Sequence, residues 1–323
     1  MNEPASASSA AVCPICSDAD VWRAHALHDD RYGYRGSFEQ QRCAACGHRW
    51  LDWLPDAATL SVLYSEHYPR GDRPVEGLRT PALASPLVAW WRGQLASAAF
   101  WVPPAVRVLD VGCGFGESLA YHRSRGCEVH GVEADRNIAR VAAHHGFDVH
   151  VGLFEPSRYA EASFDYVTMD QVIEHAIDPV ATLCGIRRVL RVGGKAVLST
   201  PNAAGVGAHI FGTRWINWHA PYHLHLFTPR SLCMGAERAG LRVAQFSTIT
   251  NSEWLNYQWI HLVTSPPVGE ASPLWAPARA GGHRRTIRLL RALHRTGVDH
   301  LLTRIADRLG IGDNLVAVFE RAS

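Results

Sequence analysis

Hydrophobic and polar positions repeat in two ways along this chain, and each repeat predicts a type of element. Apolar residues at 298, 301, 302, 305 and 309 have the spacing of one helix face, so 298–309 is predicted as an amphipathic helix. Alternation over 32–43 predicts a strand that leads into Cys43. The apolar run Val106–Val111 predicts a buried strand, and the glycines after it predict a sharp turn into a helix.

The pattern also divides the chain. Residues 70–85 are rich in proline, glycine and arginine and predict a linker. Before them, Leu60, Leu63 and Tyr64 repeat at helical spacing and predict a helix that begins near Asp56. Residues 1–12 lack the regions of a secretory signal and predict a disordered tail. We therefore expect the tail, a small module with its connecting helix at 13–69, the linker, and a large domain at 86–323.

Composition narrows the class of protein. Of 323 residues, 47% are hydrophobic and 19% are charged, as in ordinary globular proteins. The formal net charge of +2 gives no overall attraction to nucleic acid. No apolar run approaches the roughly 18 residues that span a bilayer. We therefore expect a cytoplasmic protein, whose eight cysteines stay reduced unless a metal binds them.

Four cysteines form two C-x-x-C pairs, CPIC and CAAC. Two such turns supply the four thiolates that Zn²⁺ prefers, and a site closed by four protein ligands is structural. The alternatives are unrelated buried cysteines or a redox pair, but two matched pairs without a thioredoxin-like βαβ unit favour a metal. The expected zinc ligands are Cys13, Cys16, Cys43 and Cys46.

A zinc module could also bind nucleic acid, but the segment between the pairs is not basic. Its four arginines are offset by five carboxylates. The arginines are Arg23, Arg31, Arg35 and Arg42, and the carboxylates are Asp18, Asp20, Asp29, Asp30 and Glu39. We therefore expect no nucleic-acid partner.

The glycines after Val111 have the spacing G-x-G-x-G, from Gly112 to Gly116, and Asp110 precedes them. A second strand ends in Glu133, 21 residues after the first glycine, close to the ribose-binding position of dinucleotide folds. A nicotinamide dehydrogenase is one alternative. The glycine loop, Asp110 and Glu133 together resemble the class I S-adenosylmethionine-dependent methyltransferases. The resemblance continues downstream in SFDYVTMDQVIEHAIDP and IRRVLRVGGKAVLSTPN.

The resemblance implies an α/β fold with a doubly wound, seven-stranded Rossmann-like sheet. It also implies a cofactor, S-adenosylmethionine, and a set of residues around it. The methionine end would be held by Asp110, Gly112, Cys113, Gly114 and Gly116, and the ribose would lie at Glu133 and Ala134. The adenine would be flanked by Leu153 and Phe154, and the amino acid moiety would be bordered by Asp170 and Gln171.

Histidines are the candidate bases for an acceptor proton. In WHAPYHLHLF, His219 and His223 have the i, i+4 spacing of a metal-binding helix, but Pro221 argues against a helix. In an extended segment His223 and His225 would face the same side. We therefore expect an acceptor-side pair and no metal helix here.

Two further resemblances concern these histidines. Glu174-His175 resembles the E-x-x-E-H pattern of ubiquinone O-methyltransferases and small-RNA 2′-O-methyltransferases, where it binds a divalent ion. Here Gln171 stands at the first glutamate, and an amide is a weaker ligand for a hard cation, so His175 is expected to be a base or hydrogen-bond partner. The alternative is a histidine that caps the following turn.

PYHLHLFTPRSL resembles a segment of deoxysugar C-methyltransferases, which also carry a cysteine-rich zinc module. Tyr222, His223 and His225 match the acid/base cluster of that family, and Leu224 stands at its glutamate. The alternative is a connection with exposed histidines.

About 60 residues, 251–313, precede the final strand and predict a helical insertion. Four arginines lie on one face of 283–295, with apolar residues elsewhere: Arg284, Arg288, Arg291 and Arg295. The 283–309 helices could contact an anionic membrane, bind phosphates of a lipid-linked substrate, or form a cap with a solvated arginine face.

The sequence therefore predicts an enzyme that transfers a methyl group to a small hydroxylated acceptor, with a histidine as base. A sugar or glycan-pathway intermediate is the leading acceptor. The alternative is a quinone or lipid-linked substrate methylated on oxygen at the membrane surface. An inactive methyltransferase fold is disfavoured by the intact glycines and Glu133.

Overall fold

The computed structural model describes residues 12–56, 59, 63, 67, 75–275 and 282–322. The predicted tail at 1–12 lies outside these residues except for Val12, and so do Leu60 and Tyr64 of the predicted helix. Residues 70–74 of the predicted linker are also outside them. The rest of that linker contains one short 3₁₀ turn, Val75–Gly77, and leads to helix α2, Pro86–Arg92.

The largest element is a seven-stranded sheet with the order β10-β11-β8-β7-β4-β5-β6 among the described residues. Strands β8, β7, β4, β5 and β6 are parallel, and β11 runs antiparallel to β8 and β10. The strands are β4 Arg107–Val111, β5 Glu128–Glu133, β6 Asp148–Val151, β7 Phe164–Asp170, β8 Leu190–Pro201, β10 Leu241–Thr248 and β11 Asn314–Arg321. The doubly wound sheet expected from the sequence is confirmed, and β4 forms the run predicted at Val106–Val111.

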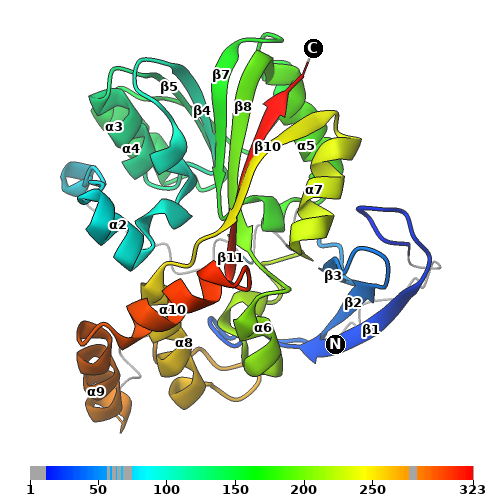
Figure 1. The fold of residues 1–323 in the computed structure, drawn as a ribbon, viewed down its shortest axis with the longest axis vertical. Coiled ribbons are helices and arrows are strands. Elements are labelled where there is room, and N and C mark those ends of the chain that lie inside the picture. Colours follow the sequence, from blue (N-terminus) through cyan, green and yellow to red (C-terminus); the bar gives the residue numbers. More distant parts are fainter. Residues whose placement is uncertain are drawn as a thin grey trace.

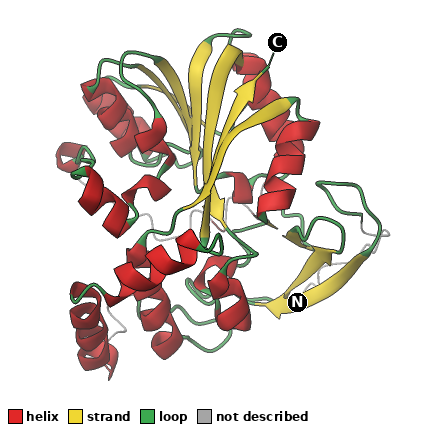
Figure 2. Ribbon diagram, viewed as in Figure 1, coloured by secondary structure: helices red, strands yellow, loops and turns green. Residues whose placement is uncertain are grey.

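Helices cover both faces of this sheet. Figure 1 shows α3 (Glu117–Ser124) and α4 (Ile138–His145) on one side, and α5 (Pro179–Val189) and α7 (Pro229–Arg238) on the other. Figure 2 shows the same layers by type of element. Alternate residues of β4, β7 and β8 point to each face, so each strand contributes to a buried core on both sides.

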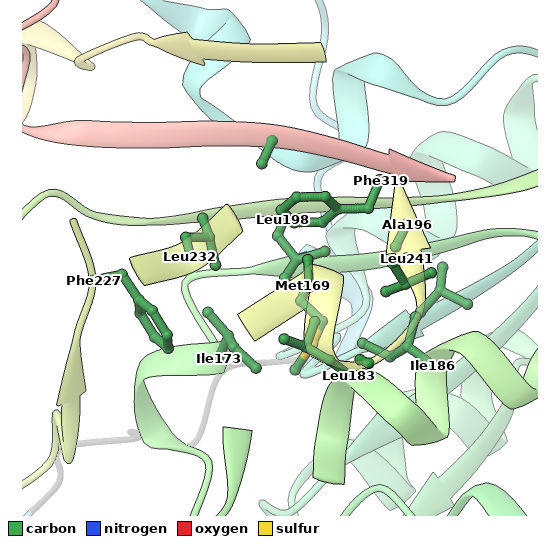
Figure 3. Close-up of a cluster of buried hydrophobic side chains, with 14 of the residues drawn as sticks. Met169, Ile173, Leu183, Ile186, Ala196, Leu198, Phe227, Leu232, Leu241 and Phe319 are labelled. Carbon is green, nitrogen blue, oxygen red and sulfur yellow. The ribbon is translucent and has the colours of Figure 1, made fainter. Parts of the chain in front are cut away.

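The core beneath α5 and α7 extends beyond the sheet. Met169, Leu198 and Phe319 come from three strands and pack against Leu183 of α5 and Leu232 of α7 (Figure 3). The same buried cluster includes Ile15, Cys43 and Trp50 from the N-terminal module. The module and the large domain therefore share one hydrophobic core.

A second sheet joins the two parts of the chain, with the order β1-β2-β3-β9. Its strands are β1 Val21–Leu27, β2 Phe38–Cys43, β3 Arg49–Leu51 and β9 His225–Leu226. The strand predicted at 32–43 is present in its second half only, because the Asp29 carboxylate accepts hydrogen bonds from the backbone of Arg31, Tyr32 and Tyr34 and holds that part as a loop. Strand β9 comes from the predicted large domain.

The helical insertion before the last strand is confirmed. It contains α8 Ser252–Thr264, α9 Arg284–Arg295 and α10 Val298–Arg308. A short helix α6, Val206–Ile210, is followed by Phe211, whose ring packs edge-on against Trp259 of α8. Among the described residues no helix combines the length and apolarity needed to cross a membrane.

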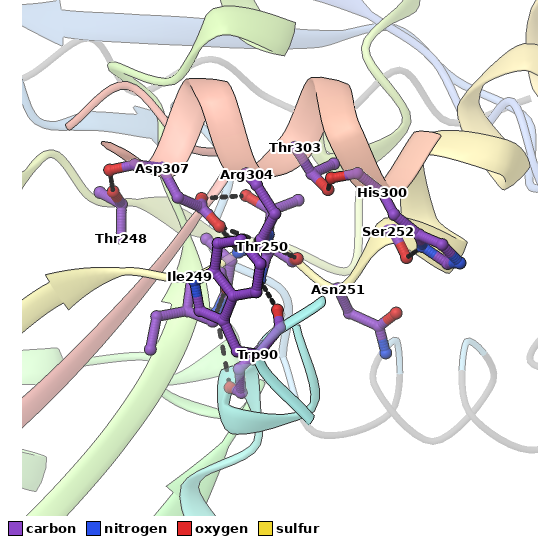
Figure 4. Close-up of polar contacts among 12 residues, drawn as sticks. Trp90, Thr248, Ile249, Thr250, Asn251, Ser252, His300, Thr303, Arg304 and Asp307 are labelled. Carbon is purple, nitrogen blue, oxygen red and sulfur yellow. Dashed lines mark hydrogen bonds and ion pairs between the residues drawn. The ribbon is translucent and has the colours of Figure 1, made fainter. Parts of the chain in front are cut away.

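A buried arginine attaches this insertion to the rest of the domain. Arg304 of α10 donates to the carbonyls of Trp90 and Thr250 and pairs with Asp307 at 2.7 Å (Figure 4). Asp307 in turn accepts from the backbone N–H of Thr250 at 2.9 Å. Because both charges are sequestered and hydrogen-bonded, this contact fixes α10 against α2 and against the chain that enters α8.

Candidate functional site

A cavity of about 510 Å³ opens where the central sheet reverses its strand order, at the carboxyl ends of β4 and β7. Ligands of open α/β sheets bind at this place. Its polar lining includes Ser97, Asp110, Glu117, Ser118, Asp170, Gln171, Asn217, Thr250, Asn251, Gln258, Asp313 and Asn314. Its apolar lining includes Phe100, Cys113, Trp215, Ile216, Trp254 and Leu255.

The glycine loop forms one wall, and its three glycines have positive φ angles. A Cβ on Gly112 would lie 2.3 Å from Val172, whereas a Cβ on Gly114 would meet no atom within 4 Å. Gly112 is therefore required by packing. Gly114 leaves open space at the cavity, which allows a ligand to approach the backbone closely.

The cavity is acidic. Asp110, Glu117, Asp170 and Asp313 line it, and no arginine, lysine or histidine does so among the described residues. Burial raises the pKa of Asp110 to about 6 and that of Asp313 to about 6. Such a lining attracts a cation, and the sulfonium and ammonium groups of S-adenosylmethionine are cations.

Neighbouring hydroxyls orient two of these carboxylates. Thr168 donates to Asp110 at 2.6 Å, and Ser118 donates to the other oxygen of Asp110. Ser97 and Ser199 donate to Asp170. These bonds favour the ionised carboxylates and oppose the effect of burial on the pKa.

The other predicted cofactor residues are not part of the cavity lining: Gly116, Glu133, Ala134, Leu153 and Phe154. Glu133 is buried at the end of β5 and accepts from the backbone N–H of Gly114 at 2.9 Å, so it supports the loop directly. Ala134 follows it. Leu153 is 63% exposed, and the Phe154 ring packs against Tyr159 and beside Gly185 of α5. The ribose and adenine roles of these residues stay predictions.

We expect Gly114→Ala to weaken binding of S-adenosylhomocysteine at least tenfold, because the added methyl group enters the open space. Gly126→Ala is the matched control, since Gly126 also has a positive φ and no atom within 4 Å of its Cβ, but does not line the cavity. Both variants bear a similar backbone strain of about 1–2 kcal/mol. Calorimetric titration checks this prediction, and equal affinities of the two variants would contradict it.

Behind the cavity wall the structure brings together Glu174, His175 and His223. One ligand atom from each lies within 4.8 Å of the others. Glu174 is fully buried; Thr200 donates to its Oε2 at 2.9 Å, and its Oε1 has no hydrogen-bond partner among the described residues. Burial raises the pKa of Glu174 to about 8 and lowers that of His223.

Backbone carbonyls fix both imidazoles of this cluster. His175 Nδ1 donates to Tyr222 O and His223 Nδ1 donates to Asn217 O, each at 2.8 Å. Nε2 of His223 therefore carries the lone pair and lies 4.0 Å from Glu174 Oε1. Asn217 itself lines the cavity, so the cluster adjoins it.

His225 does not join His223. Its Nδ1 lies 3.1 Å from Nε2 of His48 in the N-terminal module, and its ring stacks on His48. The expectation of an extended segment fails because the chain turns at His219–His223 through a cis Ala220–Pro221 bond and becomes a strand only at His225. The absence of a helix around Pro221 agrees with the sequence.

The remaining histidine-segment residues contact the N-terminal module. Tyr222 and His219 pack edge-on against Tyr32, with ring centroids 5.4 and 5.5 Å apart. Arg31 stacks 4.9 Å over Trp275 and donates to the carbonyl of Ile216, a residue of the cavity wall. The module therefore holds the histidine segment from one side.

The four predicted zinc ligands converge. Cys13 Sγ lies 3.6 Å from Cys46 Sγ, and Cys16 Sγ lies 3.5 Å from Cys43 Sγ. These separations are far longer than a disulfide bond and close to the roughly 3.8 Å between sulfurs on a tetrahedral zinc. The cluster fits a closed four-thiolate site.

Several residues of the cavity were not predicted from the sequence. These are Ser97, which comes before β4 in the sequence, Asp313 and Asn314, which stand at the start of β11, and the aromatic residues Trp215 and Trp254. Asp313 and Asn314 could have been suspected, because two polar residues stand directly before an apolar strand. The tryptophans carried no such signal.

Comparison with known proteins agrees with this geometry. A family model described as a methyltransferase domain matches residues 74–245. The ubiquinone biosynthesis O-methyltransferase of Aeromonas salmonicida is 31% identical over 159 residues, which are 44% of this chain and 66% of that protein. The enzyme with that name from Aromatoleum aromaticum is 30% identical over 224 residues, 64% of this chain and 83% of that protein.

Among solved structures, phosphoethanolamine N-methyltransferase 2 of Haemonchus contortus, in complex with S-adenosyl-L-methionine, matches with a TM-score of 0.50 at 18% identity. The match covers 85% of this chain and 62% of that one, and it concerns the fold alone. Together with the glycine loop and the acidic cavity, the family match identifies the chain as a member of the methyltransferase domain family and a class I S-adenosylmethionine-dependent methyltransferase.

Proposed function

We propose that this enzyme methylates a ring hydroxyl of an aromatic, quinone-type acceptor. The observation that carries this proposal is the cavity itself, whose lining combines aromatic and aliphatic side chains with the glycine loop. Phe100, Trp215, Trp254 and Leu255 suit the faces of a planar ring, which gains from stacking and apolar burial.

The relatives support the same acceptor. Two proteins of 30% and 31% identity are named ubiquinone biosynthesis O-methyltransferases. The sugar acceptor suggested by the histidine segment has less support, because His225 faces His48 and does not join His223 as a pair. We therefore favour a quinone precursor over a sugar.

Methyl transfer from a sulfonium requires an in-line approach, so alignment supplies much of the rate. The acceptor hydroxyl must also lose its proton, and we assign this task to the cluster of Glu174, His175 and His223. The cluster adjoins the cavity at Asn217, so the acceptor hydroxyl would have to lie at that end of the cavity. His223 presents its Nε2 lone pair toward an unpartnered oxygen of Glu174 across 4.0 Å.

The same cluster fits a divalent cation. It offers one buried carboxylate oxygen without a hydrogen-bond partner and two imidazoles whose Nδ1 atoms bind carbonyls, the outer-shell arrangement typical of metal-ligating histidines. A cation held by Glu174, His175 and His223 would favour the ionised form of an acceptor hydroxyl. Gln171 donates its amide N–H groups to Ser199 and Asn314. Its neutral carbonyl oxygen is a weaker ligand for a hard cation than a carboxylate, so Gln171 is left out of the proposed ligand set.

We further propose that Cys13, Cys16, Cys43 and Cys46 hold one structural Zn²⁺. The support is the burial of Cys13, Cys43 and Cys46 and the spacing of the four sulfurs. Four protein ligands leave no open position for chemistry.

The proposed acceptor is tested by incubating the purified protein with S-adenosylmethionine and two sets of probes. One set contains prenylated dihydroxybenzenes and the other contains nucleotide-linked keto and hydroxy sugars. We expect a mono-O-methylated product from the first set, identified by mass spectrometry and NMR. Methylation of the sugars alone would contradict the proposal.

A further inference from the structure

The helical insertion carries an apolar surface that no described residue covers. Figure 1 places α9 and α10 together at the end of the molecule opposite the C terminus. Large apolar side chains on these helices and just after them are exposed to solvent: Leu289, Leu293, Val298, Leu301, Leu302, Ile305, Leu309 and Ile311. We call this set the α9–α10 surface.

The pattern of α10 accounts for this exposure. Its buried side consists of polar groups, Asp299, Thr303 and Arg304, which form hydrogen bonds within the domain. Its outer side carries Leu301 and Ile305, which are 51% and 49% exposed. The apolar stripe that the sequence predicts therefore points away from the protein core. A row of exposed apolar side chains on one helix face is typical of a binding surface.

The charge around this surface has one sign. Six arginines between 282 and 311 are exposed: Arg284, Arg285, Arg288, Arg291, Arg295 and Arg308. The carboxylates of the same segment are sequestered, because Asp299 binds His294 and Trp259, and Asp307 binds Arg304 and Thr250. The exposed charge of the segment is therefore entirely positive.

We propose that the α9–α10 surface docks on an anionic lipid bilayer. Apolar side chains flanked by arginines suit the interface between acyl chains and anionic headgroups. A neutral apolar partner would gain no electrostatic attraction from the six arginines. A second copy of this chain would bring the same positive charges together, and they would repel each other. Charge complementarity thus favours an anionic bilayer over both.

Docking would place the bilayer beside the cavity. Arg304 and Asp307 of α10 hold Thr250, which lines the cavity, and α8 supplies Trp254 and Leu255 to the same lining. The opposite side of α10 carries the exposed stripe. The proposal goes beyond methyl transfer and does not depend on which acceptor is used, because vesicle binding needs no acceptor.

The test is flotation of the full-length protein with vesicles. We expect binding to phosphatidylcholine vesicles containing 30% phosphatidylglycerol at low salt, and at least fivefold weaker binding to phosphatidylcholine alone. The double variant Leu301→Gln/Ile305→Gln should bind the anionic vesicles at least fivefold more weakly. Each arginine near an anionic surface adds about a fivefold gain, so Arg284→Gln/Arg288→Gln/Arg295→Gln should bind at least tenfold more weakly.

Val192→Gln is the matched control, because Val192 is 60% exposed on β8, outside the insertion. It should float as wild type does, and all variants should keep the wild-type melting temperature because the replaced side chains are exposed. Wild-type protein that stays unbound from anionic vesicles at low salt would overturn the proposal. The proposal would also be overturned if the wild-type protein were a dimer that does not bind vesicles and the double variant Leu301→Gln/Ile305→Gln were a monomer. In that case a second copy of the chain would cover the surface.

Discussion

His223→Ala is expected to lower kcat at least 100-fold while S-adenosylhomocysteine binds with an affinity within threefold of wild type. His223 belongs to the cluster with Glu174 and His175 and is absent from the lining of the cavity at the glycine loop, where we expect the cofactor. Removing a positioned acid or base costs about 10²–10⁴ in rate. The measurements are steady-state turnover with the acceptor found by screening, and calorimetric titration.

Two further variants separate chemistry from folding. His223→Gln keeps much of the side-chain volume but not the base, so it should remain inactive while its melting temperature stays close to that of wild type. His225→Ala should lose less than tenfold in kcat, because His225 contacts His48 and lies apart from the cluster. Full turnover in His223→Ala would refute the assignment of the base.

A chelator distinguishes the two ways in which the cluster can act. If Glu174, His175 and His223 hold a cation, prolonged dialysis against EDTA should abolish turnover and an added divalent ion should restore it. If turnover survives complete removal of divalent ions other than zinc, His223 acts as a base without a metal. Glu174→Gln should lower kcat in either case, because the amide neither accepts a proton readily nor ligates a cation well.

Cys43→Ser is expected to remove bound zinc and to lower the melting temperature by about 10 °C or more. Losing a structural metal costs several kcal/mol, and 1 kcal/mol corresponds to about 2–4 °C in a domain of 150–250 residues. Cys43 is fully buried in the core that also contains Trp50 and Phe227. Loss of the metal should therefore also destabilise the large domain that shares this core. Metal analysis should find about one zinc per wild-type chain.

The same change should also abolish turnover, because the cysteine module holds the histidine segment. Strand β3 pairs with β9, and Thr228 donates to the carbonyl of Cys46 at 2.8 Å. Cys184→Ser is the control, since Cys184 is exposed on α5 and lies outside the thiol cluster. Wild-type protein without zinc, or full activity in Cys43→Ser, would contradict this prediction.

Local patterns in the sequence predicted individual strands and helices. The apolar run before Gly112 and the helical stripe after Gly297 have the periods of their elements, and both elements are present. The amphipathic pattern of 298–309 could not tell which side of the helix faces the protein. Tertiary hydrogen bonds of Asp299 and Arg304 place the polar side inward, opposite to the usual arrangement.

The candidate site was harder to predict because its parts are distant in sequence. Glu174 and His175 could be recognised as a pair, but His223 joins them through a turn with a cis peptide bond and through pairing of β9 with the cysteine module. Neither feature follows from spacing alone. Likewise Asp313 reaches the cavity only because β11 inserts between β8 and β10, which depends on the whole sheet.

The central claim is that the cavity at Asp110 and Gly114 binds S-adenosylmethionine. Calorimetric titration of the purified protein with S-adenosylhomocysteine tests it most directly, with NAD as the control ligand. We predict saturable binding of one S-adenosylhomocysteine per chain and no heat of binding with NAD. Binding of NAD without binding of S-adenosylhomocysteine would contradict the account.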